Sequence, residues 1–163
     1  MKEMLAQMTI LTRRARLVGL AAAWMVALAW VAPAAAQEGP GVRAGLSASP
    51  DQFFIGGHYV TKPLVDRLRF QPNVEAGFGS DTTAVAFNVE FGYWMLINAE
   101  WQTYFGGGPA MNLYSSSHDD TTDLKAGFNL LAGLRQRSGL FFELKVGVID
   151  SPDVKFTVGY TFK

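Results

Sequence analysis

The chain has 163 residues, no cysteine, 17 glycines, 13% aromatic residues and 17% charged residues. This apolar content is too high for a disordered chain, and the length allows one domain. The lack of cysteine excludes a disulfide scaffold and thiolate metal sites. Fourteen basic and fourteen acidic residues give no net charge, so the composition does not indicate binding to nucleic acid.

Residues 1–36 have the pattern of a cleaved bacterial signal peptide. Three arginines between positions 13 and 16 precede an apolar run of fifteen residues, 17–31. A transmembrane helix needs about 20 apolar residues, so a membrane anchor is the weaker interpretation. The small residues Ala34 and Ala36 predict cleavage after Ala36. The remaining domain, 37–163, carries 10 basic and 13 acidic residues and is mildly acidic.

Apolar residues alternate with small or polar ones throughout this domain, which is the pattern of β-strands. We identify eight such segments: 42–47, 53–59, 68–78, 85–93, 100–106, 128–135, 140–147 and 154–162. Turn residues such as Ser49-Pro50-Asp51 separate them. Eight strands with short turns use up the domain, so the sequence predicts an all-β fold without a further domain.

The volume of the side chains indicates which face of the sheet points inward. One face of each strand carries large apolar residues, and an eight-stranded barrel has too little internal space to hold them all. The other face is rich in glycine and polar residues, which suits a narrow interior. The sequence therefore predicts a closed, antiparallel, up-and-down transmembrane barrel with its apolar face toward lipid.

Charges of both signs fall on the inward face, where buried charges are tolerated when they are paired. We predict a charge network that plugs the lumen. Its members are Arg43, Arg69, Glu75, Glu90, Glu100, Arg135, Glu143, Lys145 and Lys155.

Some residues fit this pattern less well. Phe54, Leu131 and Phe141 are large and apolar but fall on the inward face, and Pro72 and Pro109 interrupt strands. Bulges or strand ends could accommodate them. Aromatic residues near the strand ends, including Tyr93, Trp94 and Tyr114, with Tyr160 and Phe162 near the C-terminus, are interpreted as girdles at both membrane interfaces.

The final strand, 154–162, carries the most specific pattern. Its apolar residues Phe156, Val158, Tyr160 and Phe162 alternate up to a terminal aromatic, with one residue, Lys163, after it. In this respect the domain resembles the eight-stranded outer-membrane β-barrels of Gram-negative bacteria, the OmpA-, OmpX- and opacity-like group. The glycine-rich stretches 105–110 and 126–133 are similar to those barrels as well.

The resemblance implies a monomer in the bacterial outer membrane, surrounded by its lipids and without a cofactor. It implies that Phe156, Val158, Tyr160 and Phe162 form the signal read by the barrel-assembly machinery, after transport by periplasmic chaperones. Both termini would then lie in the periplasm. The connections near Asp51, Asp81, His118 and Asp150 would face outside, and they are short for adhesin loops.

Three alternatives remain open. A lipid A-modifying enzyme would need a histidine, a nucleophile and an acid held together; the loop 115–120 supplies these residue types, but in a flexible polar segment. A small channel would need free space in the lumen. A soluble ligand-binding barrel would need the opposite face inward. We expect no catalytic or metal-binding residues and a structural or surface-interaction role.

Overall fold

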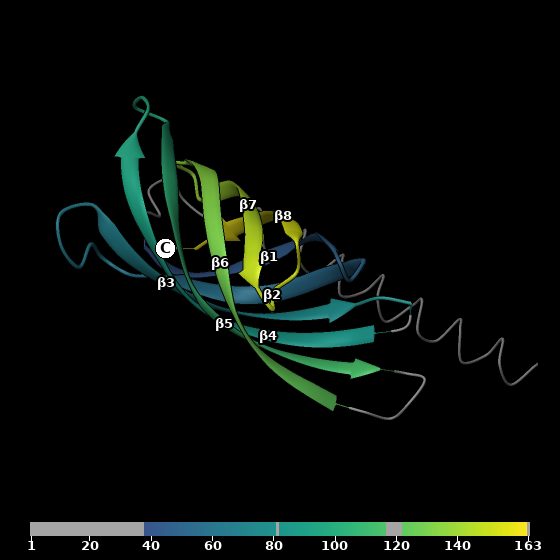
Figure 1. Ribbon diagram of the computed structural model, residues 1–163. Helices are drawn as coiled ribbons and strands as arrows, with labels where there is room; N and C mark the ends of the chain where they lie inside the picture. Colours follow the sequence, from purple (N-terminus) through teal and green to yellow (C-terminus); the bar gives the residue numbers. More distant parts are fainter. Residues whose placement is uncertain (1–37, 81, 117–121, 163) are drawn as a thin grey trace, which may run out of the picture. The chain divides into compact units, whose positions relative to one another are not determined.

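Eight antiparallel strands form a closed barrel in the computed structural model, which describes residues 38–80, 82–116 and 122–162. Each strand pairs with the next in sequence, and Figure 1 shows their order around the sheet. The strands are β1 (Gly39–Ala48), β2 (Gln52–Val60), β3 (Leu68–Phe78), β4 (Thr82–Leu96), β5 (Trp101–Ser116), β6 (Thr122–Gln136), β7 (Leu140–Ile149) and β8 (Val154–Thr161). The predicted up-and-down, all-β architecture is confirmed.

Pairing between the first and last strands closes the barrel. The register of β1 with β8 runs from Gly41 opposite Thr161 to Ala48 opposite Val154. Closure leaves neither β1 nor β8 as an open edge, so the backbone groups along both strands are paired within the sheet.

The two faces of the sheet differ in polarity, as the alternation predicts. Large apolar side chains such as Leu46, Phe105 and Leu144 are exposed on the outer face, while charged and amide side chains are buried inside. A soluble barrel would show the reverse arrangement. The inward positions of Phe54, Leu131 and Phe141 are also observed, and all three side chains are buried.

Strands β4, β5 and β6 are longer than the sequence segments predicted for them. The predicted fifth strand ends at Gly106, whereas β5 continues to Ser116, and β6 begins at Thr122 instead of Phe128. The stretch after Gly106 contains glycine and Pro109, which are typical of turns. Pairing of β5 with both neighbours keeps this stretch extended despite its composition.

Two of the strand prolines, Pro72 and Pro109, lie where the pairing with one neighbouring strand is interrupted. Pairing of β2 with β3 ends at His58 opposite Asn73, so Pro72 falls just beyond it. Between β4 and β5, no pair is formed from Val89 to Glu90, opposite Pro109. Because proline has no N–H to donate, each one is accommodated by a local gap in the ladder. The strands keep their register across the gap at Pro109.

The barrel has two ends, which we name by their contents. The terminal rim carries both ends of the described chain, near Glu38 and Phe162, and the connections 61–67, 97–100 and 137–139; the loop rim carries the connections 49–51 and 150–153. In the tight connection at the terminal rim, Gly139 adopts a positive φ of 112°, a conformation that favours glycine.

The aromatic residues differ from the predicted pair of girdles. Trp94 is buried inside the barrel, and Tyr114 lies on the inward-facing set of β5 positions and lines a polar pocket at the loop rim. Both were predicted at the membrane interface, and that prediction is wrong. Tyr93 contacts Phe105, and Tyr160 contacts Phe162, near the terminal rim. The alternation of β4 already assigns Trp94 to the same face as Glu90, but its residue type favoured an interfacial position.

Candidate functional site

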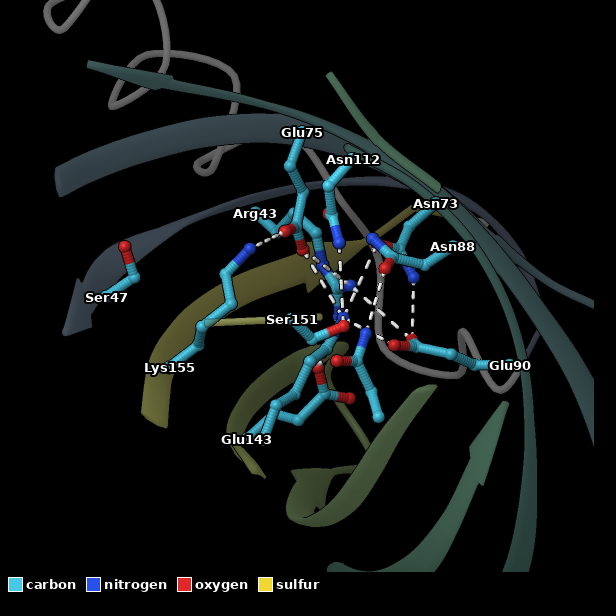
Figure 2. A network of polar contacts seen from close by, with 12 residues as sticks. Arg43, Ser47, Asn73, Glu75, Asn88, Glu90, Asn112, Glu143, Ser151 and Lys155 are labelled. Atoms are coloured by element: carbon cyan, nitrogen blue, oxygen red, sulfur yellow. Dashed lines mark hydrogen bonds and ion pairs between the residues drawn. The ribbon is translucent and has the colours of Figure 1, made fainter. Parts of the chain in front are cut away.

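Six buried charged residues meet in the middle of the lumen. We call Arg43, Glu75, Glu90, Glu143, Lys145 and Lys155 the charged cluster. Their side chains come from β1, β3, β4, β7 and β8, and Figure 2 shows the labelled members turned toward one another inside the barrel. Each is at most 6% exposed. Three cations and three carboxylates give the cluster no formal net charge.

Arg43 joins two of the carboxylates through its guanidinium. Its Nη1 donates to Glu75 Oε1 at 3.1 Å, and its Nη2 donates to Glu143 Oε1 at 2.7 Å. Residues 43 and 143 are 100 positions apart in sequence. A guanidinium presents several donors in a fixed plane, so it can hold two carboxylates at once.

The two lysines complete the charge balance. Lys145 Nζ lies 2.7 Å from Glu90 Oε1, 3.4 Å from Glu75 Oε1 and 3.7 Å from Glu143 Oε1. Lys155 Nζ donates to the other oxygen of Glu75. Lys145 and Lys155 are direct cross-strand neighbours, and their like charges are tolerated because Glu75 binds both.

Small residues on neighbouring strands make room for these side chains. Arg43 lies opposite Gly56 on β2 and Gly159 on β8. At Gly56, a Cβ would lie 3.0 Å from the side-chain Cγ of Glu75, which is a tight contact. The glycine-rich inward face therefore provides the space in which long charged side chains can pair.

A chain of asparagines extends the polar network across the lumen. Asn129 Nδ2 donates to Asn88 Oδ1 at 2.9 Å, and Asn88 Nδ2 donates to Asn73 Oδ1 at 2.8 Å. Asn73 Nδ2 then donates to Glu90 Oε2 at 2.7 Å. These three amides were not among the residues predicted for the network. The signal was present, because all three share the inward alternation with charged residues.

A second group of side chains fills the lumen toward the terminal rim. We call Val60, Trp94, Tyr104 and Leu131 the aromatic cluster, and all four are buried together. Trp94 and Tyr104 are cross-strand neighbours whose rings stack with centroids 4.4 Å apart and planes 15° apart. Tyr104 Oη donates to Glu143 Oε2 at 2.8 Å, which connects this cluster to the charged cluster.

Two of the predicted network arginines lie against the aromatic cluster. The guanidinium carbons of Arg69 and Arg135 are each 5.3 Å from the centre of the Trp94 ring. This distance is typical of cation–π interactions. Arg69 Nη1 also donates to the Thr61 carbonyl at 3.2 Å. Both arginines are buried, as their inward positions imply.

Glu100 does not line the lumen. It is exposed in the connection between β4 and β5, so its assignment to the charge network is wrong. The strand alternation stops at Leu96, and a residue beyond a strand end no longer follows the inward–outward pattern. The other eight predicted network residues are all buried in the lumen.

The residues predicted to guide barrel assembly lie on the outer face of β8 or just after it. Phe156 and Val158 are exposed, Tyr160 is half-buried, and Phe162 follows the strand and contacts Tyr160. β8 is the strand that pairs with β1 to close the barrel. The signal residues Ala34 and Ala36, and His118 in the loop considered for catalysis, lie outside the described residues.

The remaining histidine is part of the lumen packing. His58 Nε2 is 2.8 Å from Thr161 Oγ1, and the His58 ring meets the Phe141 ring edge-on with centroids 5.0 Å apart. Its hydrogen-bond partner is therefore a hydroxyl and not a carboxylate. Within the described residues, no group of three or more His, Cys, Asp or Glu side chains could hold a metal ion.

The clusters leave little space in the lumen. One internal void, bordered by Arg43, His58, Trp94 and Tyr104, has a volume of about 10 Å³, and a second beside Glu75 is equally small. A larger polar pocket of about 500 Å³ opens at the loop rim between residues such as Tyr114 and Asp150. The described part of the chain contains no helix of the length and apolarity needed to cross a membrane.

Comparison with solved structures identifies the fold. The N-terminal β-barrel domain of Pseudomonas aeruginosa OprF is 14% identical, aligns with 77% of this chain and all of that domain, and gives a TM-score of 0.55. Neisserial surface protein A is 13% identical over 76% of this chain and 94% of that one, with a TM-score of 0.49. Ail, the attachment invasion locus protein of Yersinia pestis, is 16% identical over 77% of this chain and 93% of that one, with a TM-score of 0.43.

No family model and no curated protein sequence matches the chain. The similarity to the OprF domain covers the whole of that barrel. The chain therefore has the closed eight-stranded barrel fold of bacterial outer-membrane proteins, as its resemblance to that group predicts.

Proposed function

We propose that this eight-stranded barrel is a small integral protein of the bacterial outer membrane with a plugged lumen and a structural or surface-interaction role. The observation that carries the proposal is the inverted polarity of the sheet. Its outer face is apolar, and its inner face holds a balanced set of buried charges. Such an exterior is stable in hydrocarbon and would aggregate in water.

The location is tested by fractionation and gel mobility. Residues 1–36 would direct export and be removed, and the terminal rim would face the periplasm. A closed transmembrane barrel resists detergent until it is heated, so we expect the protein in the outer-membrane fraction with different mobility before and after boiling. A soluble protein without this shift would contradict the proposal.

The filled lumen supports a non-conducting barrel. Charged and aromatic clusters occupy successive parts of the interior, and the voids beside them are each too small for a permeating solute. We therefore expect purified protein in planar bilayers to show no stable conductance steps of porin size. Such steps from the folded protein would favour the channel alternative.

The assembly role of the last strand is tested by Phe162→Ala. If Phe162 is part of the signal read by the assembly machinery, this variant accumulates less in the outer membrane than the unmodified protein. Phe105→Ala is the matched control, because Phe105 is an outward aromatic on β5, away from the closing strand. Equal yields of both variants would contradict a specific role of Phe162.

We propose further that the barrel is a monomer and not an enzyme. The environment of His58 supports the second part of this proposal, because the ring contacts the Thr161 hydroxyl and the Phe141 ring and not an orienting carboxylate. Mass spectrometry of lipid A from cells that overproduce the protein tests the main enzymatic alternative. We expect unchanged lipid A, whereas a new acylation state would support that alternative.

A further inference from the structure

A groove of about 550 Å³ crosses the outer surface of β1, β2, β3 and β4. The register places its lining side chains in two adjacent outward rows of the sheet. One row contains Tyr59, Pro72 and Val89, and the other contains Gly57, Val74 and Phe87. The backbone of the row between them, at His58 and Asn73, forms the floor.

The groove exists because one outward position has no side chain. Gly57 lies between Val42 and Val74 in its row. A Cβ built at Gly57 would meet only the carbonyl oxygen of Gly41, at 3.7 Å, which is an ordinary contact distance. By contrast, a Cβ at Gly108 would collide with the β4 backbone. Gly57 therefore borders open space that a larger side chain could fill without moving the strand.

Pro72 contributes a second irregularity at the same place. Pairing between β2 and β3 ends at His58 opposite Asn73, so Pro72, the residue adjacent to Asn73, is left unpaired on this side. The groove thus lies where the sheet has both a missing side chain and an interrupted ladder. Its walls remain apolar, since Val74, Phe87 and Val89 are all exposed there.

We propose that this groove binds one acyl chain of a membrane phospholipid, an inference that rests on the proposed membrane location. Hydrocarbon is the medium around the outward rows, and the open position at Gly57 in this shallow groove lets a chain contact the backbone as well as the flanking side chains. The groove volume also falls within the range of about 300–1,000 Å³ typical of small-molecule sites.

The polar end of the lipid lies toward the terminal rim. Tyr59 is the next-to-last residue of β2, and Lys62 follows in the connection beyond that strand. Tyrosine hydroxyls favour the membrane interface. The ammonium of Lys62 is exposed and lies 3.9 Å from Glu38 Oε1, a solvated pair that leaves Lys62 able to attract a phosphate. Because the terminal rim faces the periplasm in the proposed orientation, the occupant is a phospholipid of the inner leaflet and not lipopolysaccharide.

The test compares Gly57→Leu with Ala132→Leu. The first variant fills the groove, and the second adds the same side chain to an outward position on β6, away from the groove. Each protein is extracted from outer membranes in mild detergent, checked for heat-dependent mobility, and titrated with dioleoyl phosphatidylethanolamine in native mass spectrometry.

We expect the unmodified protein and Ala132→Leu to retain one phospholipid. Gly57→Leu should bind about tenfold more weakly, equivalent to about 1.4 kcal/mol. Equal retention by both variants, no retained lipid in the unmodified protein, or retained lipopolysaccharide would overturn the assignment. If the unmodified protein shows no heat-dependent mobility shift, the proposed function itself is contradicted. Failure of the lipid assignment can therefore be distinguished from failure of the proposed function.

Discussion

The charged cluster and the aromatic cluster fill the same lumen by different physical means. The charged cluster holds three cations and three carboxylates by mutual pairing, with Glu75 contacting Arg43, Lys145 and Lys155. The aromatic cluster is packed, with Trp94 stacked on Tyr104 and the two arginine side chains against the indole.

This difference determines how each region responds to a change. A buried ion is stable only while its partners remain, so one substitution in the charged cluster leaves several groups uncompensated. A packed ring loses contacts roughly in proportion to the atoms removed. The charged cluster should therefore tolerate single substitutions less well than the aromatic cluster.

Glu75→Gln should have the largest effect on stability. The substitution preserves the shape of the side chain but leaves the cluster with one excess positive charge near Arg43, Lys145 and Lys155. We expect the free energy of unfolding to fall by about 3–5 kcal/mol, measured by urea unfolding of the barrel in lipid vesicles. Glu100→Gln is the control, since Glu100 is exposed, and its change should stay within about 0.5 kcal/mol. Equal changes in both variants would contradict the importance of pairing.

Leu144→Arg tests whether the face of β7 opposite the lumen lies in hydrocarbon, as it must if both clusters are in the interior of the barrel. Leu144 lies beside Lys145 on β7 but points outward, with 47% of its surface exposed. A charge placed there should reduce stability by about 2–4 kcal/mol if the position lies near the bilayer midplane. Leu144→Met provides an apolar control in the same vesicle assay. A neutral result for the arginine variant would mean that the outer face of β7 is not in hydrocarbon.

Tyr104→Phe tests the hydrogen bond that connects the aromatic cluster to the charged cluster. It removes only the hydroxyl that donates to Glu143 at 2.8 Å, and the ring can still stack on Trp94. Because the acceptor is a carboxylate, we expect a loss of about 1.5–3 kcal/mol in the free energy of unfolding. Tyr104→Leu should lose more, since it removes the stacked ring as well. If Tyr104→Phe is as stable as the unmodified protein, the clusters are energetically independent.

Trp94→Phe should have the smallest effect within the lumen. Phenylalanine keeps an aromatic face toward Tyr104 but gives a weaker interaction with Arg69 and Arg135. We expect a loss of about 1 kcal/mol by the same unfolding assay. A loss of stability as large as that of Glu75→Gln would show that weaker aromatic packing and a lost charge pair destabilise the barrel equally.

The sequence could predict much of the fold because strand alternation is a local property. Val158 and Tyr160 fall on one face and Lys155 on the other whatever the partner strands are. The predicted strand was too short for β5, because Pro109 and its neighbouring glycines resemble a turn. Only pairing with β4 and β6 keeps that segment extended.

The candidate site was less predictable, because it depends on contacts between distant strands. The alternation assigned Arg43 and Glu143 to the interior, but only closure of the barrel brings residues separated by 100 positions within 2.7 Å. Arg69 and Arg135 share that inward assignment, yet their positions near the terminal rim place them against Trp94. The stagger of strands around the barrel decides these neighbours, and no local pattern encodes it.

The sequence by itself therefore determined the number of strands, the polarity of their faces and the set of side chains available to the lumen. These follow from side-chain type and a period of two along each strand. The tertiary structure decided that Glu75 pairs with three cations, that Trp94 stacks on Tyr104, and that Gly57 opens a groove. Each of these outcomes depends on which residues lie opposite one another across the closed sheet, because side chains on neighbouring strands meet only through that register.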